Sequence, residues 1–309
     1  MHLTYGASLG DLSVYADTPD LYERVVRHEI AWRLPEDFRD LLLSAAGSPH
    51  DSRYLMSTGP MPNNRTEPER TVISQYVLGE CCKRILRDDV KQLRRLYEVL
   101  RNARDMTASA GMVFKHRAHQ YLREGRVLDL FPLLADACPE GGNYIFKDHG
   151  DGHPVQLTLP RMEEHLVDGG TEHTDKLHAY YKPQSTYFSA VDSWVLVRHN
   201  PREPLTLLAI QIITDEKEHD AKTSGLDRMD KLVPADTRRS LVVFTPSGVK
   251  PQINVPTAYL TRRFPNHRDV NVVFPVFHCQ ADPVELFRQE KPKCKVMLKL
   301  LAEEPTMVA

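Results

Sequence analysis

Two apolar runs of ten residues each, 189–198 and 205–214, are separated by a short link, and each run contains one conspicuous polar side chain. The link carries two prolines and an asparagine, which favours a hairpin between two strands. Asp192 lies in the first run and Gln211 in the second. An ionised carboxylate left unpaired in a protein interior costs several kcal/mol or more. We therefore expect Asp192 to be paired, protonated, hydrogen-bonded or bound to a metal ion.

The overall charge does not indicate a partner, because 40 Lys and Arg residues nearly cancel 42 Asp and Glu residues in the 309-residue chain. A local imbalance exists between Lys83 and Arg126, where twelve basic residues face five acidic ones. Such a stretch is typical either of phosphate-binding surfaces or of the solvated faces of helices, and we favour the solvated faces. A hydrophobic content of 41% is ample for a large core.

Several classes of protein are not expected from the motifs. No apolar segment approaches the roughly 20 residues of a membrane span, and residues 1–10 lack the pattern of a secretory signal. We therefore predict a cytoplasmic or nuclear protein with no membrane partner. The five cysteines form no CxxC pair, so a zinc ribbon is not expected. No P-loop run of the GxxxxGK[ST] type occurs, which argues against ATP hydrolysis.

Helical periodicity dominates the first third of the chain. We predict a mainly helical region over residues 1–105, with a loop or linker near 47–68 and a helix starting at Pro68. A further helix is expected from Thr107, a good N-cap, to Gly125, a good C-terminal stop. After it the pattern changes to strands, and we predict an α/β domain over 106–290 followed by a tail over 291–309.

The strands and helices of the second region suggest a mixed α/β plan. Residues 161–178 have no clear period and are predicted to form a polar surface excursion. A helix is expected near Ser224–Val233. Besides the two apolar runs, the expected strands are 127–134, 143–146, 155–159, 241–245 and 270–277.

Four spaced motifs then suggest a family. They are 110–119 before the glycine-ended helix, 181–192 leading to Asp192, 211–214 starting at Gln211, and His219 before Gly225. Together they resemble the carboxy-terminal module of Crinkler and retrotransposon-hot-spot proteins, which is similar to restriction-endonuclease-fold nucleases. The resemblance covers about residues 107–280. It implies a restriction-endonuclease-like mixed β-sheet flanked by helices, in an effector or mobile-element protein that acts on or binds nucleic acid.

The resemblance also implies roles for individual residues. Asp192 would bind Mg²⁺ or Mn²⁺, and Gln211 would complete the metal site or orient water. His219 and Lys217 would act nearby in catalysis, with the metal activating water against a phosphodiester. Contacts to nucleic acid would come from Lys115, His119, Lys182 and Lys222.

Two departures from the family pattern favour an alternative. Lys115 occupies the position of the family's helix glutamate, and Ile213 stands where the endonuclease fold usually has a lysine. The alternative is a catalytically degenerate module that serves as a binding domain for a protein partner. A second carboxylate beside Asp192 would favour the nuclease. The candidates are Glu163, Glu164, Asp215 and Glu216.

A separate set of carboxylates and imidazoles lies between Asp148 and His178. Such groups together suit a divalent metal ion. Their spacing matches no HExxH-type arrangement, so we prefer the interpretation of a polar loop.

Overall fold

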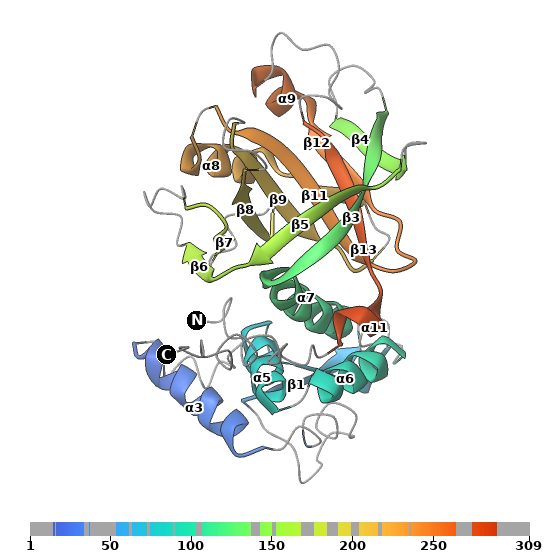
Figure 1. Ribbon diagram of the computed structural model, residues 1–309. Helices are drawn as coiled ribbons and strands as arrows, with labels where there is room; N and C mark the ends of the chain where they lie inside the picture. Colours follow the sequence, from blue (N-terminus) through green and yellow to red (C-terminus); the bar gives the residue numbers. More distant parts are fainter. Residues whose placement is uncertain are drawn as a thin grey trace, which may run out of the picture.

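The computed structural model shows a mixed α/β protein in which amino-terminal helices pack below a large curled mixed sheet (Figure 1). This confirms the predicted α/β class and the helical amino-terminal region. No helix of the described part of the chain is long and apolar enough to span a membrane. The residues described are 15, 17–33, 37, 54–61, 64–72, 75–88, 90–102, 107–136, 143–149, 153–167, 176–183, 191–198, 204–215, 218–234, 236–263 and 274–288.

The amino-terminal region contains helices and a two-stranded ribbon. The helices are α3 (Pro19–Ala31), α5 (Gln75–Asp88) and α6 (Val90–Asn102), and the ribbon is β1 (Met56–Met61) with β2 (Asn64–Val72). The predicted helix start at Pro68 is wrong, since Pro68 lies in β2 opposite Pro60. The loop or linker predicted near 47–68 contains β1 and the first part of β2 where the structure describes it. Proline lacks an N–H and is tolerated where a strand has a free edge, as in a two-stranded ribbon.

Helix α7 (Thr107–Arg123) lies between the sheet and helices α5 and α6 (Figure 1). The prediction from Thr107 to Gly125 is confirmed to within two residues. Gly125 has a φ of +83°, and a Cβ added there would lie 3.0 Å from the backbone nitrogen of Arg161. Both observations require glycine at the point where the helix gives way to the sheet.

The sheet curls because the long strand β3 (Glu124–Asp136) has different partners along its length. Strand β5 (Val155–Arg161) pairs with its first half, whereas β13 (Val276–Ala281) and β4 (Asn143–His149) pair with its second half. Ten strands follow the order β10-β12-β4-β3-β13-β11-β9-β8-β7-β6, and β5 lies off this path. The remaining bounds are β6 (Glu164–Val167), β7 (Tyr180–Pro183), β8 (Ser193–Val197), β9 (Thr206–Ile212), β10 (Glu218–Asp220), β11 (Arg238–Pro246) and β12 (Gln252–Pro256).

The hairpin predicted from the two apolar runs is confirmed. Strands β8 and β9 are antiparallel, with Ser193 opposite Ile210. Strand β9 then runs parallel to β11, with α8 (Thr223–Leu232) between them in the chain, and β11 runs parallel to β13. The helices α9 (Thr257–Arg263) and α11 (Pro283–Leu286) flank the last strands.

Both faces of the central strands are buried, which explains why their sequences are continuously apolar. On one face, Val195, Ile210 and Val242 belong to the same core cluster as the buried side chains of α7. On the other face, Trp194, Ala209 and Val243 belong to the cluster that contains the buried side chains of α8.

The other element predictions have mixed outcomes. The strands expected at 127–134, 143–146, 155–159 and 241–245 are confirmed, as is the helix near 224–233. The prediction of a surface excursion over 161–178 is wrong at β6, which pairs in parallel with β7 through backbone hydrogen bonds. Of the strand expected at 270–277, residues 270–273 lie outside the described residues and β13 begins at Val276.

Arg117 joins α7 to two other segments. Its guanidinium is buried, donates 2.6 and 3.1 Å hydrogen bonds to the carboxylate of Glu124, and donates a 2.7 Å bond to the carbonyl oxygen of Leu286.

We predict that Arg117→Met lowers the free energy of unfolding by about 2–3 kcal/mol, because hydrogen bonds to a charged group are lost together. Urea denaturation measures this. The exposed Arg94→Met variant should change stability by less than about 0.5 kcal/mol, and equal effects would contradict the prediction.

Candidate functional site

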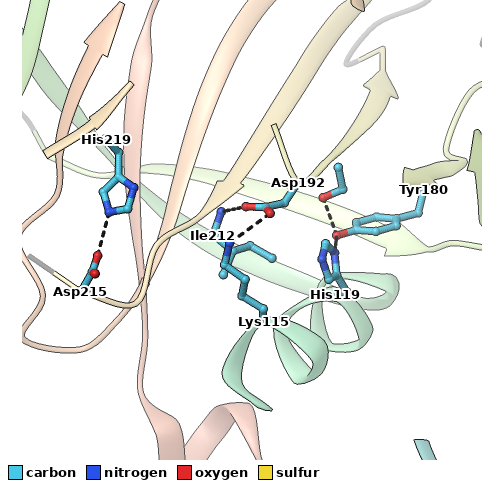
Figure 2. A network of polar contacts seen from close by, with 8 residues as sticks. Lys115, His119, Tyr180, Asp192, Ile212, Asp215 and His219 are labelled. Carbon is cyan, nitrogen blue, oxygen red and sulfur yellow. Dashed lines mark hydrogen bonds and ion pairs between the residues drawn. The ribbon is translucent and has the colours of Figure 1, made fainter. Parts of the chain in front are cut away.

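Asp192 stands directly before β8, and each oxygen of its carboxylate has one partner in the protein. The Oδ2 atom accepts a 2.7 Å hydrogen bond from the backbone N–H of Ile212, and Oδ1 lies 3.2 Å from the ammonium of Lys115 (Figure 2). The backbone N–H of Asp192 donates to the carbonyl oxygen of Ile210 at 2.8 Å. The Asp192 side chain therefore provides an acceptor at the end of the β8–β9 ladder and joins this hairpin to α7.

The donor set around Asp192 does not fit Mg²⁺ or Mn²⁺. These ions require several oxygen ligands, commonly from more than one carboxylate, and a lysine ammonium beside Asp192 repels a divalent cation. Glu164 lies 2.5 Å from Arg123, and Asp215 lies 2.8 Å from His219. Within the described segments, no group of three His, Cys, Asp or Glu side chains is placed to hold a metal ion. Of the other two candidates, Glu163 is exposed and Glu216 lies outside those segments.

Gln211 does not join Asp192. It lies in β9 between Ile210 and Ile212, whose side chains pack on the face covered by α7. Successive side chains of a strand alternate between faces, so Gln211 is directed to the opposite face. Its side chain is buried, and its Oε1 atom has no hydrogen-bond partner in the described structure. The side chains of Asp192 and Gln211 thus lie on opposite faces of the sheet.

His119, Tyr180 and Ser193 form a buried chain of hydrogen bonds. Figure 2 shows His119 and Tyr180 beside Asp192. The Nδ1 atom of His119 and the hydroxyl of Tyr180 are 2.7 Å apart, as are the hydroxyls of Tyr180 and Ser193. Burial, followed by the charge of Lys182, holds the pKa of His119 well below its ordinary value, so the ring is neutral. Burial also raises the pKa of Tyr180. This chain joins α7 to β7 and β8. A nucleic-acid contact by His119 stays a prediction that its burial does not favour.

His219 lies apart from this site. Its Nε2 atom is 2.8 Å from Oδ1 of Asp215, and Figure 2 shows this pair apart from Asp192, Ile212 and Lys115. Lys217 lies outside the described residues, and Lys222 is exposed just before α8. The structure therefore brings Asp192 and Lys115 together, but it does not bring Gln211 or His219 to them.

The charge of Lys182 also acts on the pKa of His116, a residue of α7 that the sequence prediction missed. Lys182 lies on β7 two residues after Tyr180, so it shares the face covered by α7. Burial is the main cause that lowers the pKa of Lys182. Burial and then Lys182 lower the pKa of His116 to about 3. The spacing of His116 and His119 by three residues on a predicted helix was the available signal, since it places both on neighbouring positions.

Comparisons of the chain with protein-family models, with curated proteins and with solved structures find no match. The resemblance to the Crinkler and retrotransposon-hot-spot module therefore stays a prediction from the motifs.

The contact between Lys115 and Asp192 can be measured by a double-mutant cycle. Because 41% of the lysine side chain is exposed, we expect Lys115→Met and Asp192→Asn to show a coupling energy of only about 0.5–1 kcal/mol. Asp192→Ala should destabilise more than Asp192→Asn, since it removes the acceptor of the Ile212 N–H as well. Chemical denaturation of the four proteins of the cycle and of Asp192→Ala gives these energies, and a coupling of zero would contradict the contact.

The buried imidazoles predict a pH dependence of stability. His116, His119 and His278 all have lowered pKa values, about 3 for His116 and about 4 for His278, chiefly because of burial. The unfolded chain binds protons below pH about 6.5 while these rings stay neutral in the folded protein, so stability falls as the pH decreases from about 6.5.

Each buried ring contributes a slope of at most about 1.4 kcal/mol per pH unit. Urea denaturation at pH about 7.5 and about 5 should show the loss, and His119→Gln should reduce it. The exposed His153→Gln variant is the matched control. A stability that is unchanged or higher at the lower pH would contradict this assignment.

Proposed function

We propose that this protein binds nucleic acid through phosphate contacts and does not cleave it. The observation that carries the proposal is the engagement of both Asp192 oxygens, one by the Lys115 ammonium and one by the Ile212 N–H. The carboxylate that was expected to bind the metal ion is thereby the counter-ion of Lys115. A cation at this position favours an anionic ligand over a divalent metal ion.

The charges around α7 support the binding of phosphates. Lys115 on α7 and Lys83 on α5 are substantially exposed, with 41% and 59% of their side chains accessible. Lys182 on β7 adds a third amine, which acts electrostatically on the same imidazole, His116, as Lys83 does. Phosphate contacts by lysines supply most of the affinity in binding that is independent of sequence.

The arrangement of the central strands supports an endonuclease-like core. The resemblance implies a mixed sheet flanked by helices. In agreement with it, α7 covers one face of the antiparallel β8–β9 hairpin, α8 covers the other face, and β11 runs parallel to β9. In this proposal the core has retained its architecture as a scaffold for binding in an effector or mobile-element protein.

The test is a binding and cleavage measurement on the purified full chain. Fluorescence anisotropy with single-stranded DNA, duplex DNA and single-stranded RNA should show binding that weakens about tenfold or more between about 50 and 200 mM salt. Lys115→Gln should weaken it several-fold, while Lys91→Gln on the exposed side of α6 should not. No cutting is expected with Mg²⁺ or Mn²⁺.

Two results would contradict the proposal. Metal-dependent cutting that is lost in Asp192→Ala would identify a nuclease. Failure to bind any of the nucleic acids, with the folded protein retained, would favour the alternative of a module that binds a protein partner.

A further inference from the structure

The end of strand β4 is irregular. Leu133 of β3 is the register partner of His149, and Leu134 is the partner of Lys147, so Asp148 is left over as a bulge. The φ of Asp148 is +50°, in the left-handed region that is unfavourable for residues other than glycine and is tolerated best by Asn and Asp. Such a bulge re-aims the neighbouring side chain. A strained backbone of this kind persists only where surrounding contacts hold it.

His149 supplies these contacts. Its Nε2 atom lies 2.8 Å from Nδ1 of His278 on β13, and its ring stacks on Phe131 of β3 with the ring centroids 5.0 Å apart and the planes 16° from parallel. His149 is exposed, whereas His278 is buried. Strand β3 lies between β4 and β13 in the sheet. The contact between the two imidazoles therefore ties the bulged end of β4 to a strand two positions away.

The hydrogen bonds of His278 determine which ring nitrogens carry protons. The hydroxyl of Thr245 donates to the carbonyl oxygen of Pro246 at 3.1 Å, and its Oγ1 atom lies 2.8 Å from Nε2 of His278. A hydroxyl has one hydrogen to donate, so the Nε2–H of His278 donates to Thr245. The neutral His278 ring then has only a lone pair on Nδ1. It follows that His149 donates its Nε2–H across the 2.8 Å contact.

Added protons act differently on the two rings. A proton that binds the remaining lone pair, on Nδ1 of His149, leaves the Nε2–H donor in place. A proton that binds Nδ1 of His278 occupies the acceptor of the bond, so that two N–H groups face each other when both rings are charged. Burial, followed by the charge of His149, lowers the pKa of His278 to about 4. Among the described residues, no other charged group acts on His278, whose strand neighbours are Val243 and Phe131.

We infer that the bond between His149 and His278 is a proton-operated latch, which holds the bulged end of β4 in place and releases it when both rings are protonated. The inference goes beyond the proposed function and does not rest on it. Once the bond is lost, the left-handed backbone of Asp148 has lost a contact that compensates its strain. The end of β4 then separates from β3.

The direction of the pH dependence follows from linkage. The released His278 binds a proton with an ordinary pKa of about 6.5, whereas the latched ring has a pKa of about 4. The latch is therefore fully stable above pH about 6.5, and the open form is favoured increasingly as the pH falls toward about 4. The gain is at most about tenfold per pH unit and levels off below pH about 4.

The first test is imidazole ¹⁵N NMR of the full chain. At pH about 7.5 we expect a scalar coupling across the hydrogen bond between Nε2 of His149 and Nδ1 of His278, and it should disappear as His278 is protonated. His149→Gln should raise the pKa of His278 because the like charge is removed. His153→Gln, which removes an exposed histidine outside the latch, should leave that pKa unchanged. No coupling in the folded wild type, or an unchanged pKa in His149→Gln, overturns the latch.

The second test is hydrogen exchange of the backbone amides at the end of β4, corrected for the intrinsic rate at each pH. Their opening constant should rise as the pH falls from about 6.5 to about 4, and it should rise more than that of the β9 amides, which report opening of the central strands. His278→Gln should abolish this extra rise, because a glutamine oxygen accepts from His149 whether or not that ring is charged.

A second variant covers the case in which His278→Gln does not fold. His149→Phe changes an exposed residue and removes the donor, so the end of β4 should already exchange fast at pH about 6.5. Equal rises in β4 and β9, an extra rise that persists in His278→Gln, or slow exchange in His149→Phe would each overturn the latch.

Discussion

The packing of α7 against one face of the central strands is the constraint on which the polar groups of this protein depend. The strands β8, β9 and β11 are apolar on both faces, so each face must be covered, one by α7 and the other by α8. Once α7 is fixed there, its polar side chains must find partners at the edges of that interface. Lys115 reaches the start of β8, His119 reaches β7, and Arg117 reaches the carbonyl oxygen of Leu286.

This arrangement gives Asp192 a structural role instead of the metal-binding role expected from the sequence. Asp192 serves as a hydrogen-bond acceptor for the neighbouring strand and as the counter-ion of Lys115. A lysine ammonium supplies one positive charge on the helix side of the sheet, where a divalent ion would need several anionic oxygens. The same side of the sheet has a further lysine, Lys182, whose charge no carboxylate of the described structure neutralises at close range. The balance of charge here favours an anion.

The sequence predicted the parts of the fold that depend on local pattern. The apolar runs and their proline-containing link predicted the β8–β9 hairpin, and Thr107 with Gly125 predicted the bounds of α7. The curl of the sheet was not predictable, because β3 changes partners along its length and such long-range pairing leaves no local signal. Strand β6 was missed since a four-residue strand is too short to show alternation.

The site was predicted only in part, for a related reason. Asp192 and Lys115 were singled out separately, but their contact depends on where α7 sits on the sheet. Gln211 appeared to belong with Asp192 because both interrupt apolar runs. The irregular backbone before β8 lets the Asp192 side chain reach the α7 face, whereas Gln211 inside the regular β9 follows strict alternation to the opposite face.

The most direct test of the central claim, that Asp192 is the counter-ion of Lys115 and not a metal ligand, is a titration with Mn²⁺ followed by electron paramagnetic resonance. We expect the wild-type protein and Asp192→Ala to leave the same amount of free Mn²⁺ at every concentration. Tight binding of one Mn²⁺ by the wild type that disappears in Asp192→Ala would contradict the account.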